Sequence, residues 1–343
     1  MNGSTGDKVV EEDGRNESTA QPQQPPPTVR VISCGDLNTI DDVTDARRPS
    51  TQTEEEGSRN VNKLYTVLQK VSNLHTSPKA GPFHALLLVC SEYKLDSGES
   101  AWLSGDCIDK AMRKLYETST SNASGRSMLP PIFIFNASVK LLDEVEMMTS
   151  VTSQWAANEK LEVLTGAGVV YIGKDSYYIH HREASASFKE TEELHKRMLK
   201  VCYCCGTFNP MSYDDTSGGV MAAVAAERSG EMTKRSVDGL INENRPRSVN
   251  DVTDILITPE WPAGVSHGSS AAPLGTSMSS QGCVPSALLA ASLQPRYHIA
   301  SSLRTFYQRD AYINPHGHLT RFIGLAGVGG KEKVSTFRFI ILF

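Results

Sequence analysis

The sequence predicts an α/β domain built in layers and preceded by an unstructured tail. Short apolar runs recur along the chain and alternate with stretches of helical periodicity, which is the pattern of buried strands covered by helices. The tail, residues 1–27, is polar and ends in a Gln/Pro-rich run, so its few apolar side chains cannot offset the entropy lost on ordering. The chain has 343 residues, and the part after the tail is long enough for one large domain.

The first predicted elements are a strand, a helix and a second strand. Residues 29–34 form a short β-rich run that Gly35 stops. Residues 60–74 place apolar side chains on one helical stripe. Residues 83–90 are almost continuously apolar, which is typical of a strand buried on both faces.

The series continues through the middle of the chain. An amphipathic helix is expected near residues 106–117, followed by another apolar strand over residues 131–136. Residues 168–172 and 198–205 have the same strand-like composition. Strands separated by helices favour a layered α/β domain.

Three polar segments interrupt this series and are interpreted as insertions or loops. They cover about residues 39–58, 212–250 and 264–283. The second is rich in Ser, Gly, Arg and Asn apart from an Ala-rich patch, and it is too long for an ordinary loop in a compact domain.

Charge is distributed unevenly along the chain. The formal net charge is −5 and the pI about 6.0, which excludes a strongly basic nucleic-acid binder. Residues 1–60 hold twelve acidic and six basic side chains, whereas residues 295–333 hold six basic and two acidic ones. An acidic N-terminal segment and a basic C-terminal segment favour one local anion-binding face.

The cysteines and the apolar segments indicate the compartment. Seven scattered cysteines form no regular framework, so a reducing environment is expected. Cys202, Cys204 and Cys205 lie in an apolar strand and are interpreted as core residues. The N-terminus lacks the features of a secretory signal, and no apolar stretch reaches membrane-spanning length, so no membrane partner is expected.

Two C-terminal segments carry a resemblance to a known family. They are residues 254–265, with the run Asp-Ile-Leu-Ile-Thr-Pro-Glu-Trp-Pro, and residues 295–339, which open with Pro-Arg-Tyr-His-Ile-Ala. Both resemble CwfJ-type (Cwf nineteen-like) splicing factors, which are related to the RNA lariat debranching enzyme. The resemblance implies that residues 28–343 form a calcineurin-like metallophosphoesterase-type sandwich, and that the family's HIT-like C-terminal regions are absent.

The resemblance also identifies the positions at which such a fold holds its two metal ions. A dinuclear phosphoesterase needs carboxylate, amide and imidazole ligands at strand ends. The corresponding residues here lack every histidine, and they are Asp36, Asn38, Glu92, Asn136, Pro259, Ser302 and Arg304. A fixed positive charge at Arg304 opposes a bound cation. We therefore expect no metal, no cofactor and no catalytic residue at this degenerate site.

A basic and aromatic cluster is the best candidate for binding RNA phosphate or a partner protein. Arginine and tyrosine are enriched in interface hot spots, and arginine binds phosphate through two hydrogen bonds. The cluster consists of Arg296, Tyr297, His298, Arg304, Tyr307, Arg309 and Arg321. The alternative is that its aromatic residues belong to the core, with the arginines covering them or pairing with acids.

A shorter motif offers a different interpretation. His316 and His318, followed by Thr320, resemble an incomplete His-x-His-x-His motif of HIT-type nucleotide hydrolases. The segment that follows has the composition of a plain strand, which favours a structural role.

The expected function is that of a non-catalytic, nuclear, splicing-associated protein. By resemblance, it acts in intron-lariat turnover or late spliceosome disassembly, as a cofactor or scaffold for the lariat debranching enzyme. Its expected partners are that enzyme and late spliceosome components, with RNA as a further candidate. Two alternatives stay open: an active metal-dependent phosphodiesterase or ribonuclease with a non-standard site, and a protein-interaction module that does not contact RNA.

Overall fold

The structure is a computed structural model of the chain. It describes residues 28–35, 53–90, 103–118, 127–135, 139–150, 155, 158–180, 198–214, 219–228, 230–248, 251–270, 282–303, 305–328 and 336–342. The predicted tail, residues 1–27, lies outside the described residues.

The first of two sheets has five strands in the order β13-β1-β2-β3-β4. Their bounds are β1 (Thr28–Cys34), β2 (Ala85–Val89), β3 (Ile132–Phe135), β4 (Leu161–Leu164) and β13 (Thr336–Leu342). Strands β1 to β4 are parallel, and β13 pairs with β1 in the antiparallel sense. Every residue of β2 and β3 is buried, because both faces of these strands are covered.

The second sheet follows the order β10-β12-β9-β8-β7-β5-β6, with β11 paired to β12. Its central parallel strands are β7 (Leu199–Cys204), β8 (Ile255–Ile257), β9 (Tyr297–Ala300) and β12 (Leu319–Gly324). The antiparallel pairings involve β5 (Ala167–Ile172), β6 (Tyr177–His180), β10 (Tyr307–Gln308) and β11 (Tyr312–Ile313). The carboxyl ends of the four parallel strands therefore share one edge, where open α/β sheets hold ligands.

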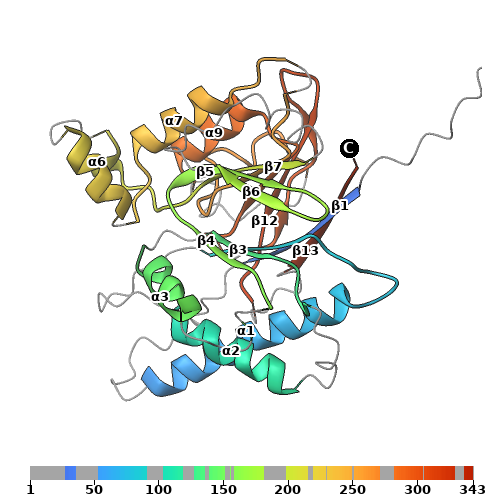
Figure 1. Cartoon of the computed structure of the whole chain (residues 1–343). Coiled ribbons are helices and arrows are strands. Elements are labelled where there is room, and N and C mark those ends of the chain that lie inside the picture. Colours follow the sequence, from blue (N-terminus) through green and yellow to red (C-terminus); the bar gives the residue numbers. More distant parts are fainter. Residues whose placement is uncertain are drawn as a thin grey trace, which may run out of the picture.

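Helices cover the outer face of each sheet, as Figure 1 shows. The first sheet is covered by α1 (Thr53–His75), α2 (Gly105–Thr118) and α3 (Val139–Ser150), and the second by α7 (Lys234–Asn244) and α9 (Val284–Leu293). The short helices α5 (Pro210–Tyr213) and α6 (Gly219–Arg228) follow β7. No helix in the described part of the chain is long and apolar enough to cross a bilayer.

Three apolar layers hold the sandwich together. The middle layer joins the two sheets, with Leu87 and Phe133 from the first packing against Val201 and Ile299 from the second. The outer layers join each sheet to its helices. In α2 the buried apolar side chains follow the helical period, and they are Cys107, Ile108, Ala111, Met112 and Leu115.

The mixed α/β architecture confirms the predicted fold class at this level. The predicted strands are observed as β1, β2, β3, β5 and β7, and the two predicted helices as α1 and α2. All seven cysteines are buried and none forms a disulfide. Cys202 and Cys204 lie on the helix-covered face of β7, and Cys205 faces the other sheet.

The segments predicted as insertions contain regular structure that the sequence did not reveal. Residues 212–250 hold α6 and α7, and Val237 and Leu240 of α7 are buried against the second sheet. Thr233 begins α7 with a reciprocal capping box, in which its hydroxyl accepts from the backbone N–H of Ser236. Residues 53–58 belong to α1, residues 264–270 form turns, and residues 271–281 lie outside the described residues.

Candidate functional site

The carboxyl edge of the second sheet is a tightly bonded junction between β8 and β9. The backbone N–H groups of Ser301 and Ser302 both donate to the carbonyl of Pro259, at 3.1 and 2.9 Å. The first sheet reaches this edge too, because a Cβ added to Gly35 would lie 2.3 Å from the carbonyl oxygen of Ala326. The ends of β1, β8, β9 and β12 therefore meet in one place, as expected for a ligand site of an α/β protein.

Two of the seven predicted metal positions lie in this junction. Pro259 offers only its backbone carbonyl, and the Ser302 hydroxyl accepts from the backbone N–H of Trp261 at 3.3 Å. The other five lie outside the described residues, and they are Asp36, Asn38, Glu92, Asn136 and Arg304. Within the described part of the chain, no three His, Cys, Asp or Glu side chains come together as a metal site.

The structure adds one carboxylate that sequence reasoning missed, Glu260. Its side chain hydrogen-bonds to Ser302, and burial raises its pKa although this bond opposes the rise. The residue before Ser302, Ser301, has a buried hydroxyl with no hydrogen-bond partner among the described residues. The position of Glu260 after the apolar strand β8 was the available signal, since carboxylates at such strand ends are common ligands.

His298 lies in the interior rather than on a binding surface. It is 1% exposed, and its Nε2 lies 2.7 Å from the hydroxyl of Thr258. That hydroxyl donates to the carbonyl of Glu260 at 2.8 Å, so the network assigns the imidazole proton to Nε2. Burial lowers the pKa of His298 to about 3, which keeps the ring neutral.

Tyr307 is also a core residue. Its ring packs against Trp261, with centroids 5.7 Å apart, and both belong to a cluster with Ala300 and Phe322. Tyr307 therefore fits the alternative interpretation, in which the aromatic residues of the cluster belong to the core. His298 is buried as well.

Arg309 is held by backbone carbonyls. Its Nε donates to the carbonyl of Val265 and its Nη2 to that of His267, both at 2.8 Å. The guanidinium also lies 4.4 Å from the ring centre of Tyr312. Through these hydrogen bonds, Arg309 links the turn after β8 to the segment after β10.

Arg296, Tyr297 and Arg321 gather at the opposite, amino-terminal edge of the sheet. Arg321 pairs with Tyr297 across β12 and β9, and its guanidinium lies 5.9 Å from the tyrosine ring centre. Arg296 forms an ion pair with Asp254 at 3.3 Å. All three basic or aromatic side chains are half-buried and retain access to solvent.

Asp254 gives this edge an unusual titrating group. Its carboxylate accepts from the backbone N–H of Lys200 at 2.9 Å. Burial nevertheless raises its pKa to about 6, against the lowering effects of the Lys200 N–H and of Arg296. The predicted cluster is therefore divided: Arg296, Tyr297 and Arg321 lie at this edge, although only Arg321 and Tyr297 share a side-chain contact. His298, Tyr307 and Arg309 lie elsewhere, and Arg304 is outside the described residues.

The His316, His318 and Thr320 motif forms a turn. The Asn314 side-chain oxygen accepts from the backbone N–H of His316 at 3.1 Å and of His318 at 3.2 Å. Thr320 is buried and donates to the carbonyl of Pro295 at 2.7 Å. These contacts give the segment a structural role.

Comparisons with known proteins identify a local similarity. No protein-family model matches the chain. A stretch of 87 residues is 45% identical to the CWF19-like protein 1 homolog of Caenorhabditis elegans, and one of equal length is 41% identical to human CWF19-like protein 1. A stretch of 83 residues is 43% identical to Zinc finger CCCH domain-containing protein 64 of Arabidopsis thaliana. These matches cover 23–24% of this chain.

The matched stretch is similar to Cwf19-like proteins. Because these relatives are named CWF19-like protein 1, the similarity supports a Cwf19-like, splicing-related family. The chain spans only 14–16% of the length of these curated relatives.

Proposed function

We propose that this chain is a non-catalytic splicing-associated protein with a degenerate metallophosphoesterase-like sandwich. The observation that carries the proposal is the 41–45% identity to CWF19-like protein 1 of human and C. elegans. It agrees with the resemblance of residues 254–265 and 295–339 to Cwf nineteen-like splicing factors. Two mixed sheets with helices on both outer faces are compatible with the sandwich that this resemblance implies.

The chemistry of the carboxyl edge supports binding rather than catalysis. A two-metal phosphoesterase needs a converging set of ligands that holds both ions and activates water. At this edge Pro259 provides no side-chain ligand, and the hydroxyl of Ser302 is engaged with the Trp261 N–H and Glu260. The imidazole of His298 is engaged with Thr258.

The proposed role is in intron-lariat turnover or late spliceosome disassembly, in the nucleus. The chain would act as a cofactor or scaffold for the lariat debranching enzyme, with late spliceosome components and RNA as further partners. The half-buried arginine edge, Arg296 with Tyr297 and Arg321, would supply the contact, since arginine and tyrosine suit both phosphate and protein surfaces.

A second candidate, an active phosphodiesterase or ribonuclease, is favoured by Glu260. This carboxylate lies where β8 ends, and β1 ends directly before Gly35 and the next residue, Asp36. A carboxylate with a raised pKa is a suitable general acid.

An assay on branched lariat RNA separates the two candidates. The purified chain is incubated with Mn²⁺, Zn²⁺ or Fe²⁺, alone and with purified debranching enzyme, and both metal stoichiometry and branch-point cleavage are measured. We expect no cleavage by the chain alone and a change in the debranching rate when both proteins are present. Stoichiometric metal with cleavage that Glu260→Gln abolishes and Asp238→Asn preserves would establish the enzyme instead.

A further inference from the structure

Strands β9, β11 and β12 present an apolar and basic surface at the arginine edge. Leu319 of β12 lies opposite Ile313 of β11, and these residues are 46% and 73% exposed. Leu319 and Arg321 are two residues apart in β12, so they share one face of the sheet. Tyr297 is the partner of Arg321 on β9 and adds its ring to this face. We call the surface formed by these four residues the docking face.

The docking face has the composition of a protein contact site. Tyrosine and arginine are enriched in interface hot spots, and neighbouring aliphatic side chains gain free energy when a partner covers them. The guanidinium of Arg321 lies 5.9 Å from the ring centre of Tyr297, and among the described residues no carboxylate pairs with it. The face therefore fits a segment that presents an aliphatic side chain followed by an acidic one.

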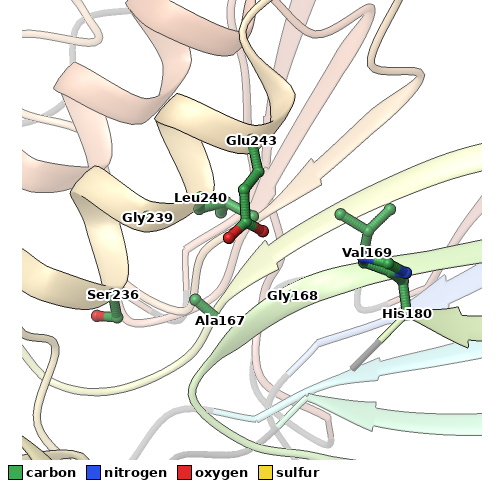
Figure 2. Close-up of a pocket in the computed structure, with 8 residues that line it drawn as sticks. All are labelled: Ala167, Gly168, Val169, His180, Ser236, Gly239, Leu240 and Glu243. Atoms are coloured by element: carbon green, nitrogen blue, oxygen red, sulfur yellow. The ribbon is translucent and has the colours of Figure 1, made fainter. Parts of the chain in front are cut away.

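Two other surface features lack this combination. Val284 and Leu288 are exposed on α9, but that helix carries no charged residue. The hollow between α7 and the strands β5 and β6 presents the carboxylate of Glu243, as Figure 2 shows, and it has room for about one water molecule. Charge and space therefore direct an acidic segment to the docking face.

The chain itself contains a segment of this kind. Residues 9–13, Val-Val-Glu-Glu-Asp, lie in the tail outside the described residues. Alternate residues of an extended segment are about 6.6 Å apart, which is also the separation expected between Leu319 and Arg321 along β12. A valine placed on the aliphatic pair thus brings the glutamate two residues later to the guanidinium of Arg321.

The tail is long enough to reach the docking face. Strand β1 begins at Thr28, and Val29 belongs to the apolar layer against which Tyr297 packs. The two sheets of a sandwich lie about 10 Å apart, whereas residues 14–27 can span about 50 Å when extended. A tether of this length gives the segment an effective concentration on the order of 1 mM at the face.

We propose that residues 9–13 bind the docking face of their own chain and cover it when no partner is bound. A contact of this size should have a Kd of about 1 mM, so the tethered segment occupies the face about half of the time. A ligand of the arginine edge then binds about twofold more weakly, because only the uncovered fraction of the protein can accept it. The contact would thus regulate the edge that the proposed function uses, although it forms without any ligand.

The test follows the methyl resonances of Ile313 and Leu319 in the methyl-labelled full chain, with neither RNA nor a partner protein present. The combined changes Glu11→Gln, Glu12→Gln and Asp13→Asn should shift both resonances. The resonances of the other exposed aliphatic pair, Val284 and Leu288, should stay in place.

A peptide of residues 8–14, acetylated and amidated at its ends, is then added to this triple variant. It should reverse the shifts with a Kd of about 1 mM. A further Arg321→Gln change should weaken the peptide at least threefold, whereas Lys110→Gln, on α2, should not.

The matched control is the combination Asp41→Asn, Asp42→Asn and Asp45→Asn, which removes the same three charges from a segment that follows the carboxyl end of β1. It should leave both resonances unchanged, and thermal melts verify that all variants fold. Equal or absent shifts in the two triple variants would overturn the proposal. Shifts that depend on protein concentration would assign the face to a second copy of the chain instead, and shifts that appear only with an added RNA oligonucleotide would assign it to RNA. None of these results bears on the splicing-associated function, because the measurement contains no splicing component.

Discussion

The imidazole of His298 and the hydroxyl of Thr258 lie 2.7 Å apart across neighbouring parallel strands, in a part of the sheet closed to water. The ring of Phe322 meets the imidazole edge to face, with centroids 5.3 Å apart. This contact fixes a neutral histidine in the core, where the residue stabilises the fold.

Acid should unfold the protein through His298. Its pKa of about 3 in the folded state lies below the value near 6.5 expected in the unfolded chain, so the unfolded state takes up the proton first. Stability should therefore fall as the pH drops from 6.5 towards 3, with a loss of about 4–5 kcal/mol at the lower end. Denaturant unfolding of wild type and His298→Gln across this range measures the slope.

The exposed His267 supplies the control for this experiment. Its backbone carbonyl accepts from Arg309, and a change of side chain leaves that carbonyl in place, so His267→Gln should retain the wild-type slope. An unchanged slope in His298→Gln would show that the buried imidazole does not govern acid unfolding.

Asp254 should have the opposite effect on the pH dependence. Its folded-state pKa, raised to about 6, lies above the unfolded value, so the folded state holds the proton more tightly. Stability should decrease as the pH rises from 4 to 6, by up to about 2–3 kcal/mol. Asp254→Asn should remove this slope.

The control is Asp238→Asn, which removes an exposed carboxylate. A large loss of stability in Asp254→Asn at pH 7 would mean that the ion pair with Arg296 outweighs the cost of burying the carboxylate.

Gly324 should tolerate no side chain. A Cβ at this position would lie 2.1 Å from Cζ2 of Trp261, whose ring is fully buried and cannot move aside. Gly324→Ala should cost at least about 3 kcal/mol of unfolding free energy, the upper range of overpacking. Gly166→Ala is the comparison, because no described atom lies within 4 Å of its added Cβ and only its φ of 63° is strained.

A double-variant cycle identifies the contact. Gly324→Ala combined with Trp261→Leu should cost less than the sum of the single changes, since the smaller side chain relieves the clash. Additive costs would contradict the close approach of these two residues.

The arginine edge should carry any affinity for RNA. We predict that Arg321→Ala weakens binding to single-stranded RNA and reduces the slope of log affinity against log salt by about 0.7, the value for one lost phosphate contact. Lys110→Ala, on the helix layer of the first sheet, should change neither quantity. The same titration on Arg304→Ala tests the position after β9, and binding lost only there would move the RNA site to the carboxyl edge.

The sequence predicted much of the layered fold, because strands buried on both faces appear as continuous apolar runs. Residues 83–90 and 131–136 were recognised in this way. Helix α9 was missed because its Ala, Leu and Ser residues lack a clear apolar stripe and follow a Gly/Ser-rich segment. Helix α7 was missed since its few apolar residues are diluted by polar ones.

The site was predicted only in part, for a geometric reason. Arg296 and Ser302 are six residues apart, yet β9 runs between them at about 3.3 Å per residue and separates them to opposite edges of the sheet. The carbonyl partners of Arg309 are 42 and 44 residues away in the chain, so no local pattern could reveal them. The resemblance does not mark Glu260, because the metal positions that it implies do not include this residue.

The proteins and RNA that bind the chain test the proposed splicing-associated function. The tagged chain is purified from nuclear extract with and without ribonuclease, and the bound proteins and RNA are identified. We predict recovery of the lariat debranching enzyme, late spliceosome components or intron lariats, and retention after ribonuclease treatment identifies direct protein contacts. Recovery of none of these, from an extract in which they are abundant, would contradict a splicing-associated function.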